Sequence, residues 1–182
     1  ALLTIGCIAL AGAIIAIEQW DRNKIEEEAF KSTAKAYASS ISTFRNFYAS
    51  VILERIHDAD IEVTHDYKKR KNALPIPATM SIDLVEYLNA RESQVNLRIV
   101  SRYPFPWREG RETSVFEENA FAHFDTTASE SYSQSRNSEI GPIFEYAQPV
   151  RMQAACVSCH NSHEDSPKTD WKIGDVRGIQ VV

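Results

Sequence analysis

Two cysteines and a histidine in the last sixth of the chain, Cys156-Val157-Ser158-Cys159-His160, have the residue types and the spacing to do chemistry. On a helix, residues three and four apart are neighbours, so Cys156, Cys159 and His160 share one face. Both thiols can then add across the two vinyl groups of one haem while the imidazole binds the iron. The pattern is that of c-type haem attachment, and in a chain of this composition it arises by chance about once in a thousand.

Two other chemistries use similarly spaced cysteines. A redox dithiol normally opens a helix after a strand in a βαβ unit, and the sequence shows no such unit. A zinc site needs a further ligand, which His163 could supply. The motif favours covalent haem c, with its iron, over both alternatives.

The N-terminal stretch from Ala1 to Ile17 carries no charge, and Glu18 and Trp20 follow it. It covers roughly 25 Å of helix, slightly less than the hydrocarbon core of a bilayer. We therefore expect a transmembrane helix over residues 1–17 that is truncated upstream, with a signal peptide and a buried core helix as alternatives. Cys7 is then a bystander in lipid. Because haem c is attached outside the cytoplasmic membrane, we expect an inner-membrane protein with residues 18–182 in the periplasm.

Composition excludes several classes of protein. The chain has 182 residues, a formal net charge of -5 and a pI near 5.6, which argues against binding nucleic acid. Three cysteines are too few for a disulfide scaffold. No H-E-x-x-H motif and no phosphate-binding loop is present, so we do not expect an enzyme.

A long helix is predicted from residue 18 to about residue 57, because the run to Arg55 contains no Pro or Gly. Apolar residues recur along it at alternating spacings of four and three. This seam either packs on the chain's own domain or forms the stem of a parallel homodimer. Its members are Phe30, Ala34, Tyr37, Ile41, Phe44, Tyr48 and Val51.

The remaining chain mixes helices and strands and predicts an α+β fold. Helices are expected over residues 81–90, with Ser81 as the cap, and over residues 114–124. Strands are expected over residues 96–101, within 142–152 and over 176–182. The last strand has no polar tail, so we expect the protein to continue beyond it.

Three segments, Ile76–Thr79, Ser101–Arg108 and Cys156–Gly178, resemble the signature segments of a bacterial c-type haem sensor family, first catalogued as a domain of unknown function. The resemblance covers most of residues 20–182. It implies a PAS-like antiparallel sheet with flanking helices, preceded by a long helix continuous with the transmembrane segment. The expected parts are therefore a transmembrane helix (1–17), a long helix or dimer stem (18–57) and a PAS-like c-type haem domain (58–182). Family members often precede HAMP, cyclase, diguanylate cyclase or histidine kinase modules.

The sequence departs from the best-known member type, in which a cysteine on the first long helix is the second axial ligand. No cysteine lies between Cys7 and Cys156, so another group must serve, or the position is open or bound by water. His65 is favoured because it lies in a short polar segment just past the long helix. The other candidates are His57, His123, His163, Met80 and Met152.

Arginines and aromatic residues are the further candidates for haem contacts. Arg102 and Arg108 are expected to pair with the haem propionates, since Arg forms paired hydrogen bonds to carboxylates, whereas Arg98 and Arg177 are weaker candidates. Each aromatic candidate could equally belong to the ordinary core. These aromatic residues are Tyr103, Phe105, Trp107, Tyr146 and Trp171.

The leading hypothesis is an extracytoplasmic sensory module. A gaseous ligand or a redox partner changes the bonding of the haem iron, and the long helix passes that change to an output module outside this fragment. The alternative is a membrane-anchored monohaem c-type cytochrome that only transfers electrons. A zinc-dependent structural domain is the third possibility.

Overall fold

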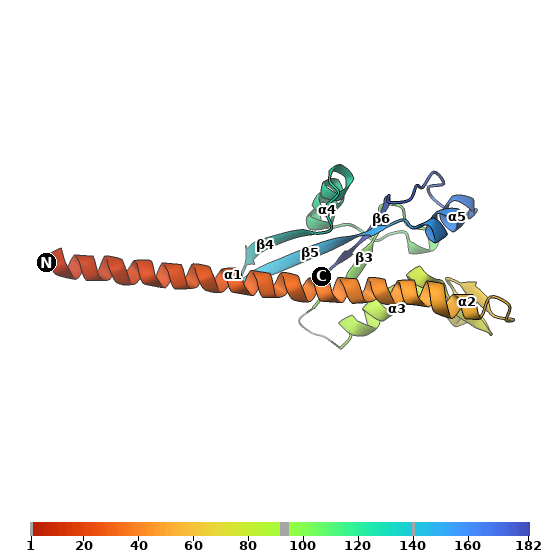
Figure 1. Ribbon diagram of the computed structural model, residues 1–182, viewed down its shortest axis with the longest axis horizontal. Helices are drawn as coiled ribbons and strands as arrows, with labels where there is room; N and C mark the ends of the chain where they lie inside the picture. The colour runs from red at the N-terminus through yellow and green to blue at the C-terminus, as the bar shows by residue number, and fades with distance from the viewer. Residues whose placement is uncertain (1, 92–94, 140) are drawn as a thin grey trace.

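Four strands form an antiparallel sheet in the order β3-β6-β5-β4, and helices lie on both of its faces (Figure 1). The computed structural model describes residues 2–91, 95–139 and 141–182, with side chains from Leu10 onward except at position 155. The strands are β3 (Arg98–Val100), β4 (Tyr132–Ser138), β5 (Gly141–Arg151) and β6 (Val176–Val181). The expected α+β class, antiparallel sheet and long N-terminal helix are confirmed.

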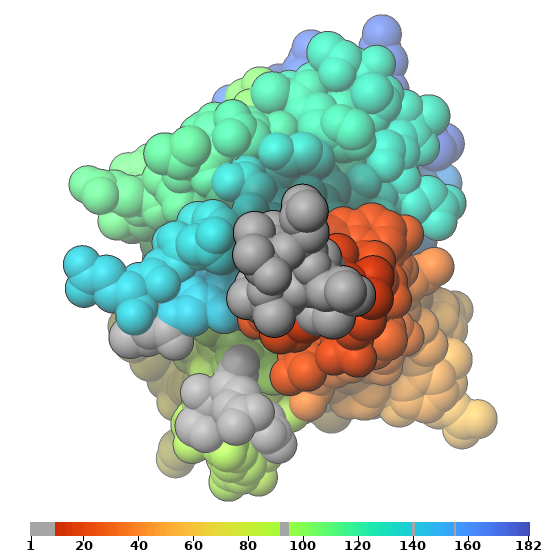
Figure 2. All heavy atoms as spheres, turned by 90° about the vertical axis from the view of Figure 1, so that its left-hand side faces the viewer, coloured from red at the N-terminus to blue at the C-terminus, as the bar shows by residue number. Residues whose placement is uncertain are grey.

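Helix α1 (Leu2–Phe47) packs along one face of the sheet with its C-terminal half, while its N-terminal half extends beyond the domain (Figure 1). It continues as one turn of π-helix (Tyr48–Ile52) and ends in α2 (Leu53–Arg55). Viewed from the N-terminal end, the β4–β5 hairpin lies beside α1 (Figure 2), and Phe30 of α1 stacks on Phe144 of β5 with ring centroids 5.3 Å apart.

The predicted seam on α1 packs mainly on the chain's own domain. Ala34 and Ala38 contact Tyr146 of β5, and Ile41 packs with Val85 and Leu97. Two seam members, Phe44 and Val51, are instead exposed. The expected homodimer stays a prediction.

The structure contradicts the expected transmembrane helix. In the described part of the chain, no helix combines the length and the apolar character that crossing a membrane demands. A span needs about 20 mainly apolar residues, whereas α1 carries charged residues from Glu18 onward. The prediction of a transmembrane segment at residues 1–17 is therefore wrong. The inner-membrane localisation inferred from it is also wrong. The side chain of Cys7, expected to face lipid, lies outside the described residues.

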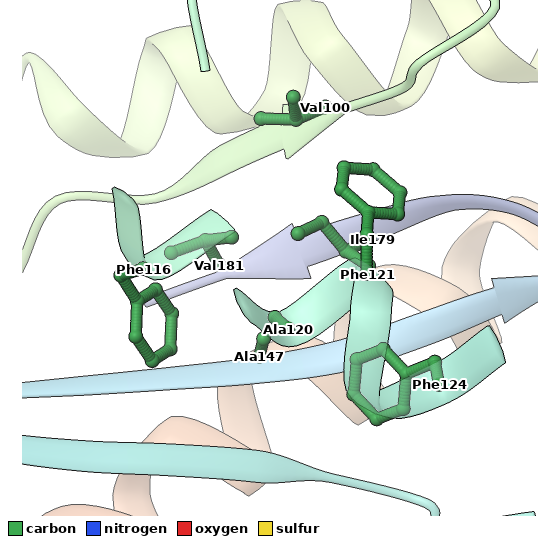
Figure 3. Close-up of a cluster of buried hydrophobic side chains, with 8 residues drawn as sticks. All are labelled: Val100, Phe116, Ala120, Phe121, Phe124, Ala147, Ile179 and Val181. Atoms are coloured by element: carbon green, nitrogen blue, oxygen red, sulfur yellow. The ribbon is translucent and has the colours of Figure 1, made fainter. Parts of the chain in front are cut away.

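Helix α4 (Val115–Thr126) covers the opposite face of the sheet. The predicted start of this helix is confirmed. Ser114 and Glu117 form a capping box in which each side chain bonds the other's backbone N–H. Its apolar face supplies the main core of the domain (Figure 3), which comprises Val100, Phe116, Ala120, Phe121, Phe124, Ala147, Ile179 and Val181.

Helix α3 (Pro77–Asn89) begins earlier than the sequence predicted. Pro77 occupies its first turn, where a missing N–H costs nothing, and Ile76 is the N-cap residue. Ser81 is therefore not the cap but a buried residue within the helix, whose hydroxyl donates to the carbonyl of Pro77 at 3.0 Å.

Short elements connect α2 to α3 and carry candidate site residues. Strands β1 (Glu62–Thr64) and β2 (Ala73–Pro75) form a parallel pair, and a 3-10 turn over Tyr67–Lys69 lies between them. A second 3-10 turn, Pro106–Arg108, follows β3. Strands β1, β2 and β4 were not anticipated. The first two have only three residues each, and β4 is almost entirely polar.

Candidate functional site

Helix α5 (Ala154–Ser162) carries the cysteine and histidine motif and follows directly after β5 (Figure 1). Its start is fixed by Met152, a buried residue whose N–H donates to the Asp175 carbonyl and whose own carbonyl accepts from Gly174 N–H. Both thiols are free, with Cys156 half-buried and Cys159 exposed. The helix therefore presents two reduced cysteines and His160 at the predicted spacing on one face.

His160 is half-buried beside Arg177 of β6. The Nε of Arg177 donates to Nδ1 of His160 over a long 3.4 Å. Burial, aided by the positive charges of Arg177 and His163, lowers the pKa of His160 to about 4. Its imidazole is therefore neutral near pH 7, which is the form that binds a metal.

Arg177 itself is held in place by residues of the same site. Its guanidinium donates to the hydroxyl of Ser101 and lies over the rings of Phe105 and Trp171, at 5.8 and 5.5 Å from their centroids. Burial lowers the pKa of Arg177 to about 10. Among the described residues, no carboxylate forms an ion pair with it.

A chain of ring contacts joins His160 to His65. Phe105 lies 5.4 Å from His160 and stacks on Trp107 at 4.6 Å, measured between ring centroids. Trp107 in turn stacks on His65 at 3.9 Å with the rings only 9° from parallel. His163 also contacts this group, at 5.3 Å from Phe105. The structure thus brings His65, the candidate favoured as second ligand, and helix α5 to the same aromatic cluster.

Trp171 closes the other side of the site. Asn161 bonds both the N–H and the carbonyl of Trp171, and so ties the loop to the end of α5. Tyr103 meets Trp171 edge-on, with ring centroids 5.4 Å apart. The indole nitrogens of Trp107 and Trp171 are buried and have no hydrogen-bond partner among the described residues.

Arg108 and Arg102, the two arginines expected to pair with haem propionates, lie in different parts of the structure. Arg108 is half-buried, donates to Thr79 at 2.7 Å and follows Trp107 directly. Arg102 is exposed and is paired with Asp125 at 2.6 Å and with Glu118 at 3.4 Å. Because carboxylates of α4 already occupy its guanidinium, the structure does not bring Arg102 to the cluster around His160.

The remaining ligand candidates have other surroundings. His57 lies on an exposed turn, 3.0 Å from Asp58, and His123 packs against Tyr132 with ring centroids 5.2 Å apart. Met152 is buried at the base of α5, and Met80 is half-buried within α3.

Sequence reasoning undervalued Arg177 and missed Arg45. Arg177 is in the quoted segment Cys156–Gly178, but nothing in the order of residues places it against His160. Arg45 follows Ile41 by one helical turn on α1, and a lone arginine in a helix usually indicates a solvated residue. The structure instead places it partly buried near Cys156.

The zinc alternative gains no support from the geometry. Within the described ranges, no group of three or more His, Cys, Asp or Glu side chains is arranged to hold a metal ion.

The fold and this site define an α+β domain whose motif helix places His160 between Arg177 of β6 and an aromatic cluster. The chain belongs to the Tll0287-like family, whose model matches residues 22–182, and this places it among sensory or cytochrome-like domains. Searches of curated proteins and of solved structures found no match. The PAS-like character of the sheet stays a prediction.

Proposed function

We propose that this chain is a sensory domain that carries haem c bound covalently through Cys156 and Cys159. The observation that carries the proposal is α5, which presents two free thiols and a neutral imidazole on one face. Each thiol can add across one vinyl group, forming a C–S and a C–H bond, so no oxidant is needed. The bound haem supplies an iron that can change oxidation state or bind a small ligand.

The surroundings of α5 fit such a group. Phe105, Trp107 and Trp171 offer flat apolar surfaces, and two of them hold indole N–H groups without a partner. Arg177 and Arg108, which contact or adjoin the aromatic cluster, are the favoured cations for the propionates, and neither forms an ion pair with a carboxylate among the described residues. Arg102, engaged by Asp125, is a poorer choice than the sequence indicated.

His160 binds iron through Nε2 when Nδ1 carries the proton. Here Nδ1 accepts a hydrogen bond from Arg177, so the neutral ring has its proton on Nε2. With the Nδ1 proton that iron at Nε2 would require, His160 would no longer accept a hydrogen bond from Arg177. The guanidinium would then be free to bind a carboxylate, which supports Arg177 as a propionate partner.

The proposed signal leaves through helix α1. This helix packs on β5, the strand that leads into α5, so a shift of α5 would reach α1 through β5 and Tyr146. The π-helical turn over Tyr48–Ile52 is an irregularity of the kind often found at functional sites. The proposal also includes a gaseous ligand or a redox partner as the input and a homodimer as the assembly. The output module lies outside residues 1–182, and the domain itself is not an enzyme.

Covalent attachment is tested with the chain produced in cells that contain the haem c maturation machinery. We expect a haem band that survives denaturing electrophoresis in the wild type and is lost in Cys156→Ser/Cys159→Ser. Cys7→Ser is the matched control and should keep the band, because the motif lacks that residue. A wild-type protein that loses all haem on denaturation contradicts the proposal.

His65 is the residue that would supply the second ligand to the iron, because its ring lies in the same aromatic cluster as His160. We expect His65→Ala to lose the low-spin absorption spectrum while the covalent haem band remains. His57→Ala and His123→Ala are matched controls on other surfaces and should keep the wild-type spectrum. Spectra recorded with and without CO and NO measure whether the vacated position binds gas. An unchanged spectrum in His65→Ala excludes this ligand.

A further inference from the structure

A polar cavity lies between helix α1 and strand β5, beside the segment that leads into α5. Its volume is about 260 Å³. Ser42 and Arg45 of α1 line one side, Gln148 and Arg151 of β5 line the other, and Glu130 contributes from the loop before β4. Of these residues, Arg45 also lies near Cys156 of the proposed haem site.

The cavity holds two guanidinium groups without acidic partners. Arg45 makes one long hydrogen bond, 3.5 Å to the hydroxyl of Ser42. Arg151 donates to two backbone carbonyls, those of Gly174 at 3.1 Å and Ser129 at 3.3 Å. Among the described residues, neither arginine forms an ion pair with a carboxylate. Two arginines against the single Glu130 leave the cavity with excess positive charge, and paired N–H groups of Arg match a carboxylate.

The lining residue Gln148 adds one unpaired acceptor to the cavity, and its neighbour Gln180 on β6 has a second one that does not line it. Gln148 lies directly opposite Gln180 in the β5–β6 register, and the amide nitrogen of Gln180 donates to Ser42. The amide oxygens of both glutamines are buried and have no partner among the described residues. A buried acceptor left without a donor costs about 1–3 kcal/mol. A molecule that fits this cavity therefore presents an O–H or N–H donor as well as a negative charge.

We propose that this cavity binds a small free carboxylate whose neighbouring carbon carries a hydrogen-bond donor, as in α-hydroxy acids and α-amino acids. The carboxylate binds Arg45 and Arg151, and the donor binds the amide oxygen of Gln148. An ammonium donor also faces the charge of Glu130. The ligand then bridges α1 and β5 next to the first residue of α5, where it can influence the same helix as the proposed haem.

Calorimetric titration with lactate, alanine and propionate tests the inference, because these three acids differ only in the O–H, N–H or hydrogen at the second carbon. We expect lactate or alanine to bind at least about tenfold more tightly than propionate. Arg45→Gln should weaken that binding about tenfold or more, and Gln148→Leu should abolish the preference over propionate. Arg136→Gln is the matched control and should bind normally. It removes a guanidinium on β4 that is paired with Glu145 on β5, away from the cavity.

Each titration is made on protein with and without haem, so that the outcome does not depend on the proposed function. Binding to both forms supports the proposal. Binding only to haem-free protein means that a haem propionate takes the arginines, which overturns the assignment to a free ligand. No binding to either form, or equal binding by Arg45→Gln, also overturns it. Thermal unfolding is recorded for each variant, and Arg45→Lys replaces any Arg45→Gln protein that does not fold.

Discussion

Gly178→Ala is expected to destabilise the domain by about 2–3 kcal/mol, the cost of forcing an extra methyl group into a closely packed interior. Gly178 lies on β6, a central strand, where a Cβ atom would stand only 2.5 Å from the backbone carbonyl oxygen of Val100 on β3. Backbone atoms cannot rotate aside as a flexible side chain does, so β3 and β6 must separate. Urea denaturation followed by circular dichroism measures the loss.

Gly12→Ala is the matched control for this substitution. Gly12 lies on α1 with open space where its Cβ would be, so the same chemical change meets no neighbour. We expect no loss of stability there. Because Arg177 precedes Gly178, separation of β3 from β6 also displaces the guanidinium from Ser101 and His160. A Gly178→Ala protein as stable as the wild type would show that the sheet relaxes without cost.

Acidification from pH 7 to pH 4 is expected to remove about 1–2 kcal/mol of stability from the haem-free protein through His160. Folding lowers the pKa of this imidazole from 6.5 to about 4, mainly by burial. The unfolded chain therefore binds the proton more tightly than the folded one between these values. The contribution of neutral His160 to the free energy of unfolding is complete above pH 6.5 and is lost as the pH falls toward 4. Since His160 is only partly buried, the expected loss is smaller than the full shift implies.

His160→Gln is expected to flatten this part of the pH profile, as measured by urea denaturation at a series of pH values. His57→Gln, which removes an imidazole from an exposed turn, is the matched control. Arg177→Met should raise the pKa of His160 partway back toward 6.5, which NMR titration can follow, because a nearby positive charge disappears while burial remains. An identical pH profile in His160→Gln and wild type would assign the acid sensitivity to other groups.

The long helix, the capped helix and the motif helix were predictable because their signals are local. Ser114 and Glu117 are three residues apart and need only each other to begin α4. The absence of Pro and Gly after Glu18 suffices to predict that α1 is long. Strand β4 escaped notice because it lies at the sheet edge and carries polar side chains on both faces, so no alternation marks it.

The transmembrane prediction rested on the uncharged stretch from Ala1 to Ile17 and was wrong. The continuous long helix is present, but among the described residues no helix is both long enough and apolar enough to cross a membrane. The absence of charge over 17 residues is a weaker criterion than a full span of about 20 mainly apolar residues.

The sequence by itself determined the chemistry available to this protein: two thiols and an imidazole whose spacing places them on one helical face. Only the tertiary structure decided the environment of that chemistry. It placed Arg177 against His160, stacked His65 on Trp107 and assigned Arg102 to the acidic residues of α4. The physical reason is that covalent spacing fixes neighbours within a helix, whereas burial, charge and pKa depend on residues brought together from distant strands and turns.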